Sequence, residues 1–135
     1  FAGIVVAPVT FNTDQWIGAE VLTQFQEGQI MTENFLRLSY LVNVVIVSVI
    51  LYEGYKFKKF ERDTLTQVAT FFVLATGLLF AHYYIPDIIA MQEQGVEATQ
   101  SAAFMNTHKG SEINFKIFSL ALIVLMVQNM RKACK

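Results

Sequence analysis

Two histidines, His82 and His108, are the residues of this chain whose chemistry points most directly to a bound metal ion or cofactor. An imidazole ring is a common metal ligand, and it also suits proton transfer because it titrates near neutral pH. His82 lies in the stretch FAHYYIPD, at the end of a long apolar run and four residues before Pro86. Proline lacks the N–H that would bond to the His82 carbonyl in a helix, so the ring is expected beside a locally opened backbone.

His108 lies in the stretch NTHKGSEINF, one helical turn before Glu112. Residues three and four apart share a helix face, so His108, Ser111 and Glu112 are expected on one side. An imidazole and a carboxylate in this arrangement can bind a divalent cation. The alternative is a solvated helix start, in which Glu112 stabilises the N-terminal turn. For His82 the alternative is an interfacial ring that bonds to a backbone carbonyl, with two tyrosines beside it.

The helices that carry the two histidines are joined by one connection, so the two rings are expected to approach each other near one membrane face. The candidate metal ligands are therefore His82, His108, Asp87 and Glu112, with copper or another divalent ion as the metal. Two imidazoles across a helical bundle also suit haem b, which makes His82 and His108 candidate cofactor ligands. The sequence has no second histidine pair and no CxxCH haem-attachment motif. We assign no catalytic residue.

The elements that must position these residues are apolar helices. The chain is 54% hydrophobic and 16% charged, whereas a soluble domain is typically about 45–50% apolar and about 25% charged. Three runs, at about 35–52, 68–85 and 113–130, approach the ~17–25 residues that a membrane-crossing helix needs. Inside lipid such runs must form helices, because the backbone has to satisfy its own hydrogen bonds. A shorter apolar stretch at about 1–11 is predicted to be part of a further helix.

The predicted fold is therefore all-α: a single integral membrane bundle over residues 1–135, with three complete transmembrane helices and a partial N-terminal one, four in all. Three helices with the N-terminus outside is the alternative arrangement. Proline is rare, with two residues in the chain, and twelve phenylalanines fit helices that are apolar on every side.

Basic residues orient the predicted spans. The 53–64 loop and the C-terminus hold seven of the ten basic residues, whereas the 12–34 and 86–112 segments are acidic and contain Lys109 as their one basic residue. Lys and Arg favour the cytoplasmic side. The 53–64 loop and the C-terminus are therefore predicted to be cytoplasmic, and the two acidic segments outside, in a bacterial inner membrane. A net charge of -1 and the absence of a phosphate-binding loop predict no nucleic-acid partner.

Three further positions have packing interpretations. Asn43 lies midway along its apolar run, where an Asn commonly hydrogen-bonds a neighbouring helix. Arg37 follows Glu33 by one turn, and it is expected to pair with Glu33 or to extend toward the headgroups. Gly77 is expected on a close-packing helix face.

Two glycines are predicted to interrupt helices in the acidic segments. An interfacial helix over about 21–31 is expected to break at Gly28. The chain is expected to turn near Gly95 and then to re-enter a helix. The last helix would then be longer than its buried part.

Several of these residues resemble a known family. The opening AGIVVAPVTF, with Ala7, Pro8 and Phe11, resembles the end of the first helix in the small membrane family known as domain of unknown function 4149, which includes the transmembrane-protein-205-like proteins. In that family a proline follows the third helix, and the fourth opens with a histidine and then a serine three residues later. Pro86, His108 and Ser111 resemble these residues, with Asn114 next in phase, and QFQEGQIMTENFLRLSY resembles bacterial members.

The resemblance covers essentially the whole chain, and it implies a fold of about four helices more than a function. The family is similar to copper-resistance-D-like membrane proteins and, more distantly, to haem-containing membrane protoporphyrinogen oxidases. That kinship favours a metal ion or haem at the two histidines by analogy alone.

The leading prediction is a non-enzymatic inner-membrane bundle that binds a metal ion, haem or another small ligand near the outer face through His82 and His108. One alternative is a membrane redox protein with haem b at the same residues. The other is a structural or accessory membrane subunit without a ligand. The expected partners are the lipid bilayer and either another membrane protein or further copies of the chain.

Overall fold

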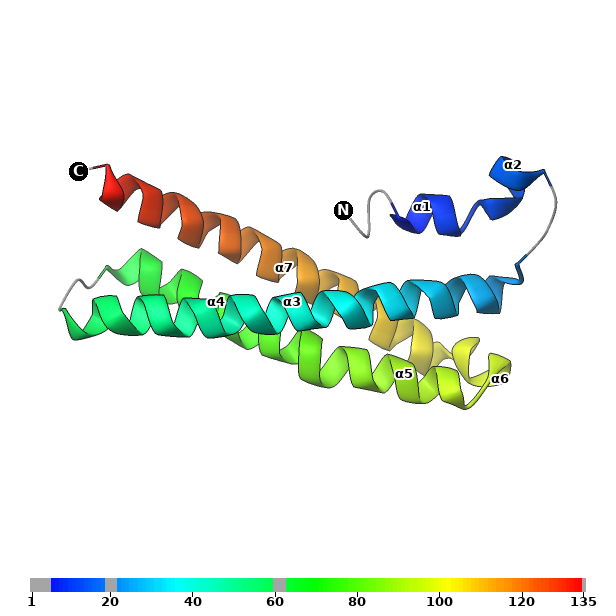
Figure 1. Cartoon of the computed structure of the whole chain (residues 1–135). Coiled ribbons are helices and arrows are strands. Elements are labelled where there is room, and N and C mark those ends of the chain that lie inside the picture. Colours follow the sequence, from blue (N-terminus) through cyan, green and yellow to red (C-terminus); the bar gives the residue numbers. More distant parts are fainter. Residues whose placement is uncertain (1–5, 19–21, 60–62, 135) are drawn as a thin grey trace.

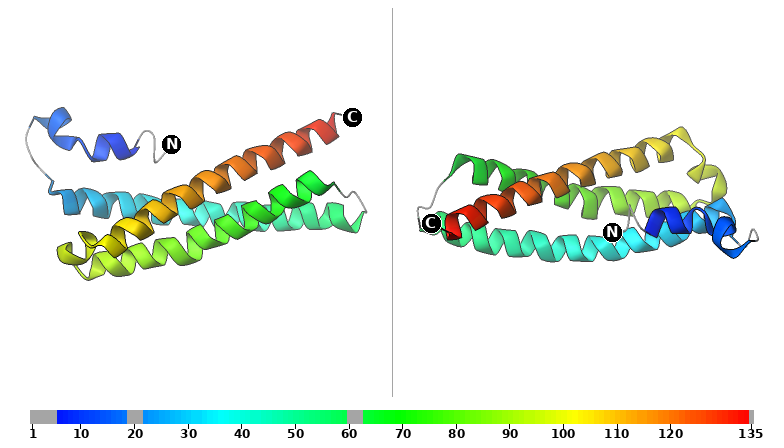
Figure 2. Two further views of the ribbon diagram at one scale, coloured as in Figure 1. Left: turned by 180° about the vertical axis from the view of Figure 1, so that it is seen from behind. Right: turned by 90° about the horizontal axis from the view of Figure 1, so that it is seen from above.

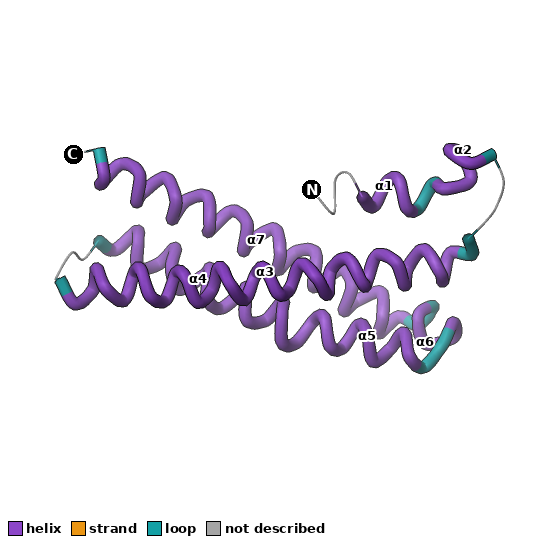
Figure 3. Tube along the Cα trace, in the orientation of Figure 1, coloured by secondary structure: helices purple, strands orange, loops and turns teal. Residues whose placement is uncertain are grey.

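The computed structural model of the protein describes residues 6–18, 22–59 and 63–134. These segments are almost entirely helical, and no strand occurs within them (Figure 1, Figure 3). In chain order the elements are α1 (Ala7–Thr10), α2 (Thr13–Ile17), α3 (Gln24–Lys58), α4 (Thr64–Leu79), the π-helical turn η2 (Phe80–Tyr84), α5 (Ile85–Glu93), α6 (Val96–Thr99) and α7 (Ala102–Ala133).

Three long rods make up the bundle: α3, the continuous rod α4–η2–α5, and α7 (Figure 1). Figure 2 shows α3 and the α4–η2–α5 rod running side by side in opposite directions, with α7 crossing them. The rods contain 35, 30 and 32 residues, and each is long and apolar enough to cross a membrane. Even the shortest is about 45 Å long, more than the roughly 30 Å hydrocarbon core. The prediction of an all-α integral membrane bundle is therefore confirmed.

The outer surface of the bundle is apolar on all three rods. Leu41 on α3, Phe71 on α4 and Leu120 on α7 keep 64%, 66% and 65% of their accessible surface. Water would penalise such a surface at about 25 cal/mol per Å², and soluble monomers rarely expose continuous apolar patches of this kind. Lipid tails solvate it without that penalty. The exposed surface therefore fits contact with a bilayer.

An aromatic seam fills the space between the rods. Phe80 of η2 lies between Phe35 of α3 and Phe115 of α7, with ring centroids 6.5 and 4.9 Å away. The Phe35 ring meets Phe80 edge-on, in a geometry that aromatic pairs prefer. Val73, two turns before Phe80 on the same rod, is fully buried. The seam therefore joins all three rods at one level of the bundle.

Gly77 lies at a close approach of all three rods. A Cβ atom at this position would lie 3.0 Å from both Ile46 Cδ1 of α3 and Phe118 Cε2 of α7. Small residues at such points let helix backbones approach each other in membranes. The predicted close-packing face at Gly77 is therefore confirmed.

Side-chain caps start each rod before its apolar run begins. Thr23 and Gln26 form a reciprocal capping box at the start of α3. Asp63 accepts from the Thr66 N–H at the start of α4, at 3.1 Å, and the Ser101 hydroxyl caps α7. Each rod is therefore longer than the apolar run that predicted it.

The two glycines predicted to interrupt helices behave differently. α3 continues through Gly28 without a break, because one glycine costs a helix only about 1 kcal/mol relative to alanine. The turn at Gly95 is confirmed: its φ of +99° lies in the region that favours glycine. α7 then starts at Ala102 and runs well beyond the predicted 113–130 segment.

The predicted partial helix at about 1–11 is described only from residue 6 onward, because residues 1–5 lie outside the described segments. Within it, α1 forms a short helix, and α2 follows directly. Gly18 ends α2 with a φ of +75°. Figure 1 shows α1 alongside the first half of α3.

We expect Gly77→Val to destabilise the bundle by about 1–3 kcal/mol, because its Cβ and methyl groups would overlap Ile46 and Phe118. Unfolding in mixed detergent micelles, followed by far-UV circular dichroism, measures the effect. Gly54→Val is the matched control, since a Cβ at Gly54 would meet nothing within 4 Å. Equal losses in both variants would show that helix propensity, not close packing, explains Gly77.

Candidate functional site

His82 lies on the π-helical turn. The Ile85 N–H donates to the Phe80 carbonyl five residues earlier, so the backbone widens around His82. Pro86 has no N–H to donate to the His82 carbonyl, and the widened π turn lets the helix continue without that hydrogen bond. The rod therefore continues to Glu93, beyond the predicted end of the span near residue 85.

The His82 ring binds the neighbouring rod α3. Its Nε2 lies 3.0 Å from Asn43 Oδ1. Asn43 sits midway along the apolar run of α3, so this hydrogen bond places His82 level with the middle of that run and not with its outer end. The expected contact between Asn43 and a neighbouring helix is confirmed.

His108 pairs with residues of its own helix. Its ring stacks on Phe104, with centroids 6.1 Å apart and planes 9° apart. Its Nε2 lies 3.8 Å from Glu112 Oε1, and the other Glu112 oxygen lies 3.5 Å from Lys116 Nζ. The His108 and Glu112 side chains are 44% and 53% exposed. The predicted imidazole–carboxylate pair therefore forms, on an open helix face that also carries a lysine.

Asp87 joins α5 to α7 through a different residue. Thr107 Oγ1 donates to Asp87 Oδ2 at 3.2 Å. One turn away, the Tyr84 ring lies against Gly110, where a Cβ would come within 3.0 Å of Tyr84 Cε1. Glycine at position 110 is therefore what lets the tyrosine ring lie against the α7 backbone.

The four predicted metal ligands thus have three separate sets of partners. His82 binds Asn43, Asp87 binds Thr107, and His108 pairs with Glu112. Within the described segments, no group of three or more His, Cys, Asp or Glu side chains could hold a metal ion.

Two other predicted polar residues have local or packing partners. Asn114 Nδ2 donates to the Thr76 carbonyl at 2.7 Å, a buried hydrogen bond between α7 and α4. Arg37 Nε lies 2.9 Å from Glu33 Oε1, as the i, i+4 spacing predicted, and both side chains are exposed. Such an exposed pair contributes little to stability, typically below about 1 kcal/mol.

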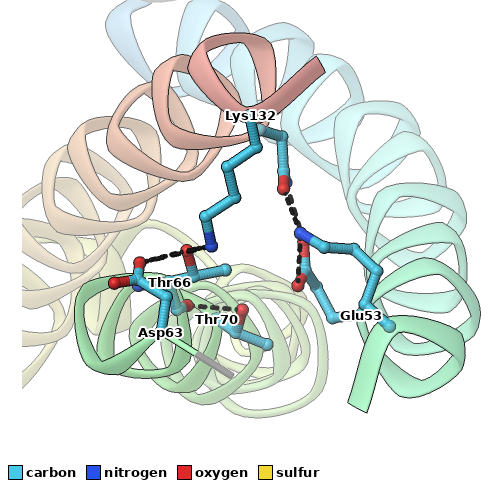
Figure 4. A network of polar contacts seen from close by, with 7 residues as sticks. Glu53, Asp63, Thr66, Thr70 and Lys132 are labelled. Atoms are coloured by element: carbon cyan, nitrogen blue, oxygen red, sulfur yellow. Dashed lines mark hydrogen bonds and ion pairs between the residues drawn. The ribbon is translucent and has the colours of Figure 1, made fainter. Parts of the chain in front are cut away.

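A polar network that the sequence did not predict joins the rods at the opposite end of the bundle (Figure 4). Lys56 Nζ donates to Asn129 Oδ1, and Asn129 Nδ2 donates to Glu53 Oε1 at 2.7 Å. Lys56 also pairs with Glu53 at 3.4 Å, and the two side chains are only 8% and 12% exposed. Asn129 therefore satisfies both members of a buried ion pair, which would otherwise be costly.

The second half of this network is more open. Lys132 Nζ of α7 donates to Thr66 Oγ1 at 3.0 Å and lies 3.4 Å from Asp63 Oδ2. The Thr66 hydroxyl and N–H both donate to the same Asp63 oxygen, at 2.7 and 3.1 Å. These Thr66 hydrogen bonds, with a smaller effect of Lys132, lower the pKa of the Asp63 carboxyl from its ordinary value of 3.8.

A sequence signal for this network exists, but it is weak. Glu53 and Lys56 are three residues apart on one helix face, and Asn129 interrupts an apolar stretch one turn before Arg131–Lys132. By sequence, Lys56 belongs to the basic 53–64 segment, which predicts the orientation of the spans and not a buried ion pair. Lys56 is buried because α7 ends beside it, and the residues around Lys56 in the sequence do not predict that contact.

We expect stability to fall as the pH drops from about 3.8 through the lowered pKa of Asp63. A carboxyl whose pKa is lower in the folded state stabilises that state above the unfolded pKa, and the contribution disappears on protonation. Asp63→Asn should be less stable than wild type near pH 7 and should converge with it as the pH falls through the lowered pKa of Asp63. Detergent unfolding at several pH values measures this, with Asp14→Asn as the control. A constant gap between wild type and Asp63→Asn would contradict the assignment.

Comparison with known proteins identifies a family and not a chemistry. The model of the family described as a domain of unknown function, DUF4149, matches residues 1–97, so His108 and Glu112 lie beyond the matched part. No curated protein and no solved structure matches the chain. Since the family model covers well over half of the 135 residues, the chain belongs to the DUF4149 family, as its opening segment and Pro86 predicted.

Proposed function

We propose that the protein is a non-enzymatic, structural or accessory component of the membrane. The observation that carries this proposal is the use of its intramembrane polar groups as ties between rods. Asn43–His82 ties α3 to η2, and Asn114 ties α7 to α4. Thr107–Asp87 ties α7 to α5, and the Glu53–Lys56–Asn129 network ties α3 to α7.

Such ties have a physical purpose in lipid. Lipid tails are as apolar as the helices, so burial of apolar surface does not drive the rods together. Packing and interhelical hydrogen bonds must do so, at roughly 0.6 kcal/mol per hydrogen bond. Every pair of rods in this bundle has at least one polar tie. This supports a role in which the polar residues maintain the shape of the bundle and do not catalyse a reaction.

A cation site at His108 and Glu112 is a second candidate function. The 3.8 Å distance between His108 Nε2 and Glu112 Oε1, and the exposure of both side chains, favour it. One imidazole and one carboxylate leave room for water to complete the coordination of a divalent ion. Lys116 opposes it, because its ammonium already pairs with Glu112. Asp87 and His82 would not take part, since they bind residues of other rods.

Haem b is the third possibility raised by the sequence, and it requires two axial rings on one iron. For His82 this would mean breaking the hydrogen bond to Asn43. For His108 it would mean leaving Phe104 and Glu112. The redox alternative therefore requires both histidines to change partners, and we place it below the other two.

We propose the membrane orientation from the basic residues. The end that carries Lys56, Lys132 and Arg131 would be cytoplasmic, and the end that carries Asp87, α6 and His108 would be outside. Figure 1 shows the end of α3, the start of α4 and the end of α7 at one end of the bundle and α6 at the other.

Protein purified without added haem or metal should show no Soret band and less than stoichiometric metal. Absorption spectroscopy and elemental analysis test this, followed by calorimetric titration with Zn²⁺. His82→Ala and His108→Ala are matched variants, because each removes one ring. A Soret band in the wild type that is lost in both variants would show that the protein binds haem through these histidines, and it would contradict the structural role. Zn²⁺ binding that is lost only in His108→Ala would establish the cation site.

A cysteine at Glu97 should react with a membrane-impermeant thiol reagent in intact cells. Glu97 lies in α6, at the end proposed to be outside. The wild type, in which the native Cys134 is exposed, is a separate control that should react only after lysis. The Glu97→Cys variant carries Cys134→Ser as well, so that its label reports position 97 alone. Labelling of Glu97→Cys only after lysis would reverse the orientation.

A further inference from the structure

The Asn43–His82 pair lies on the outside of the bundle. His82 is exposed and Asn43 is half-buried, and exposed apolar side chains flank them one turn away: Tyr40 and Val47 on α3 and Leu78 on α4. Polar groups at this depth normally face a bundle interior, because lipid offers no hydrogen bonds. The position of the pair therefore points to a further protein surface.

The pair also has unused hydrogen-bonding capacity. Asn43 Oδ1 can only accept, so the His82 Nε2 that binds it carries the proton. In the neutral imidazole His82 Nδ1 is then an acceptor, and Asn43 Nδ2 keeps its two N–H donors. Because the two side chains touch, the pair has a donor and an acceptor at one level of the membrane.

A seven-residue spacing surrounds Asn43 on α3. Leu36, Asn43 and Ile50 are seven residues apart, and each is followed four residues later by a residue on the same side. This is the spacing of helices that pack along their length, and a single Asn in such a row fixes register and the number of helices. We call this row the α3 stripe; it consists of Leu36, Tyr40, Asn43, Val47, Ile50 and Gly54.

Two open hollows lie between α3 and the α4–η2–α5 rod, one on each side of Asn43. One, of about 270 Å³, is bounded by Ile50, Gly54 and Leu74, among others. The other, of about 220 Å³, lies beside Leu36 and Ile89 and is otherwise lined by polar residues. Gly54 has open space where a Cβ would be. The stripe thus has room to receive side chains from another helix.

We propose that two copies of this chain associate through the α3 stripe, around a twofold axis along the membrane normal. This inference rests on the structural role proposed above and names the partner as a second copy. A twofold axis along the normal keeps every residue at its own depth. Asn43 and His82 share one depth, because they touch each other. Asn43 Nδ2 of each copy can therefore donate to Nδ1 of the partner's His82, which satisfies both groups.

Self-complementarity is what favours a second copy over a different protein. A different partner would need its own acceptor and donor in the same order at the same level. A copy of this chain supplies both by symmetry, together with an identical apolar stripe. Figure 1 shows α1 and α5 on opposite sides of the first half of α3.

Single-molecule photobleaching in liposomes, over a range of protein-to-lipid ratios, measures the association. The wild type should form dimers, and the double variant Asn43→Leu with His82→Leu should dimerise at least about tenfold more weakly. Ser48→Leu is the matched control: Ser48 is also an exposed polar residue of α3, but it lies outside the stripe and its hydroxyl donates to the Val44 carbonyl of its own helix. Circular dichroism should show all three proteins folded, because the core is unchanged and α7 still binds both of the other rods through Lys56–Asn129 and Asn114–Thr76.

Disulfide cross-linking locates the surface. In a Cys134→Ser background, Ile50→Cys should form a dimer on mild oxidation, because Ile50 lies on the stripe two turns from Asn43. Leu120→Cys on α7 is the control. It is similarly exposed and lies at a comparable level, since the neighbouring Phe118 meets Gly77 and Ile46. It should not cross-link.

Four results would overturn the proposal. The wild type could be monomeric at every ratio, or the double variant could dimerise like wild type. Leu120→Cys could cross-link in place of Ile50→Cys, or the wild type could co-purify only with a different chain. These outcomes are separate from the spectrum and metal analysis, which test the structural role without reference to association.

Discussion

The absence of a side chain at Gly77 is the constraint on which the bundle depends. Only a hydrogen atom separates the α4 backbone from Ile46 and Phe118. One residue earlier, the Thr76 carbonyl accepts from Asn114, and three residues later Phe80 enters between Phe35 and Phe115. A larger residue would move the rods apart, so the buried hydrogen bond and the aromatic seam would weaken together.

The polar ties also fix how far the rods can slide along one another. They occur at three levels: Glu53–Lys56–Asn129 near one end, Asn43–His82 and Asn114–Thr76 in the middle, and Asp87–Thr107 near the other end. A shift of one helical turn is about 5.4 Å, which is far beyond hydrogen-bonding reach. Such a shift would break several ties at once, so the bundle has one well-defined register.

Sequence reasoning predicted what is local and missed what depends on the pairing of rods. Apolar runs gave the three rods, and i, i+4 spacing gave the Arg37–Glu33 and His108–Glu112 pairs. Composition and a central Asn gave the interhelical role of Asn43. The level of His82 was not predicted, because it depends on the offset between α3 and the next rod. The burial of Lys56 was missed for the same reason, since Asn129 approaches it from a helix 73 residues further along the chain.

The π turn has a mechanical consequence. Helices bend at prolines and at π turns, and the middle rod has both within Phe80–Pro86. The Tyr84 ring, at the end of the π turn, lies against Gly110 of α7, and the Thr107–Asp87 hydrogen bond then holds α5 to α7. The rod can therefore bend beside His82, and the contacts of Tyr84 and Asp87 with α7 hold its last part in position. If α5 changes its angle to α4 there, α6 and the start of α7 move with it, while the Gly77 contact and the polar network at the far end stay in place.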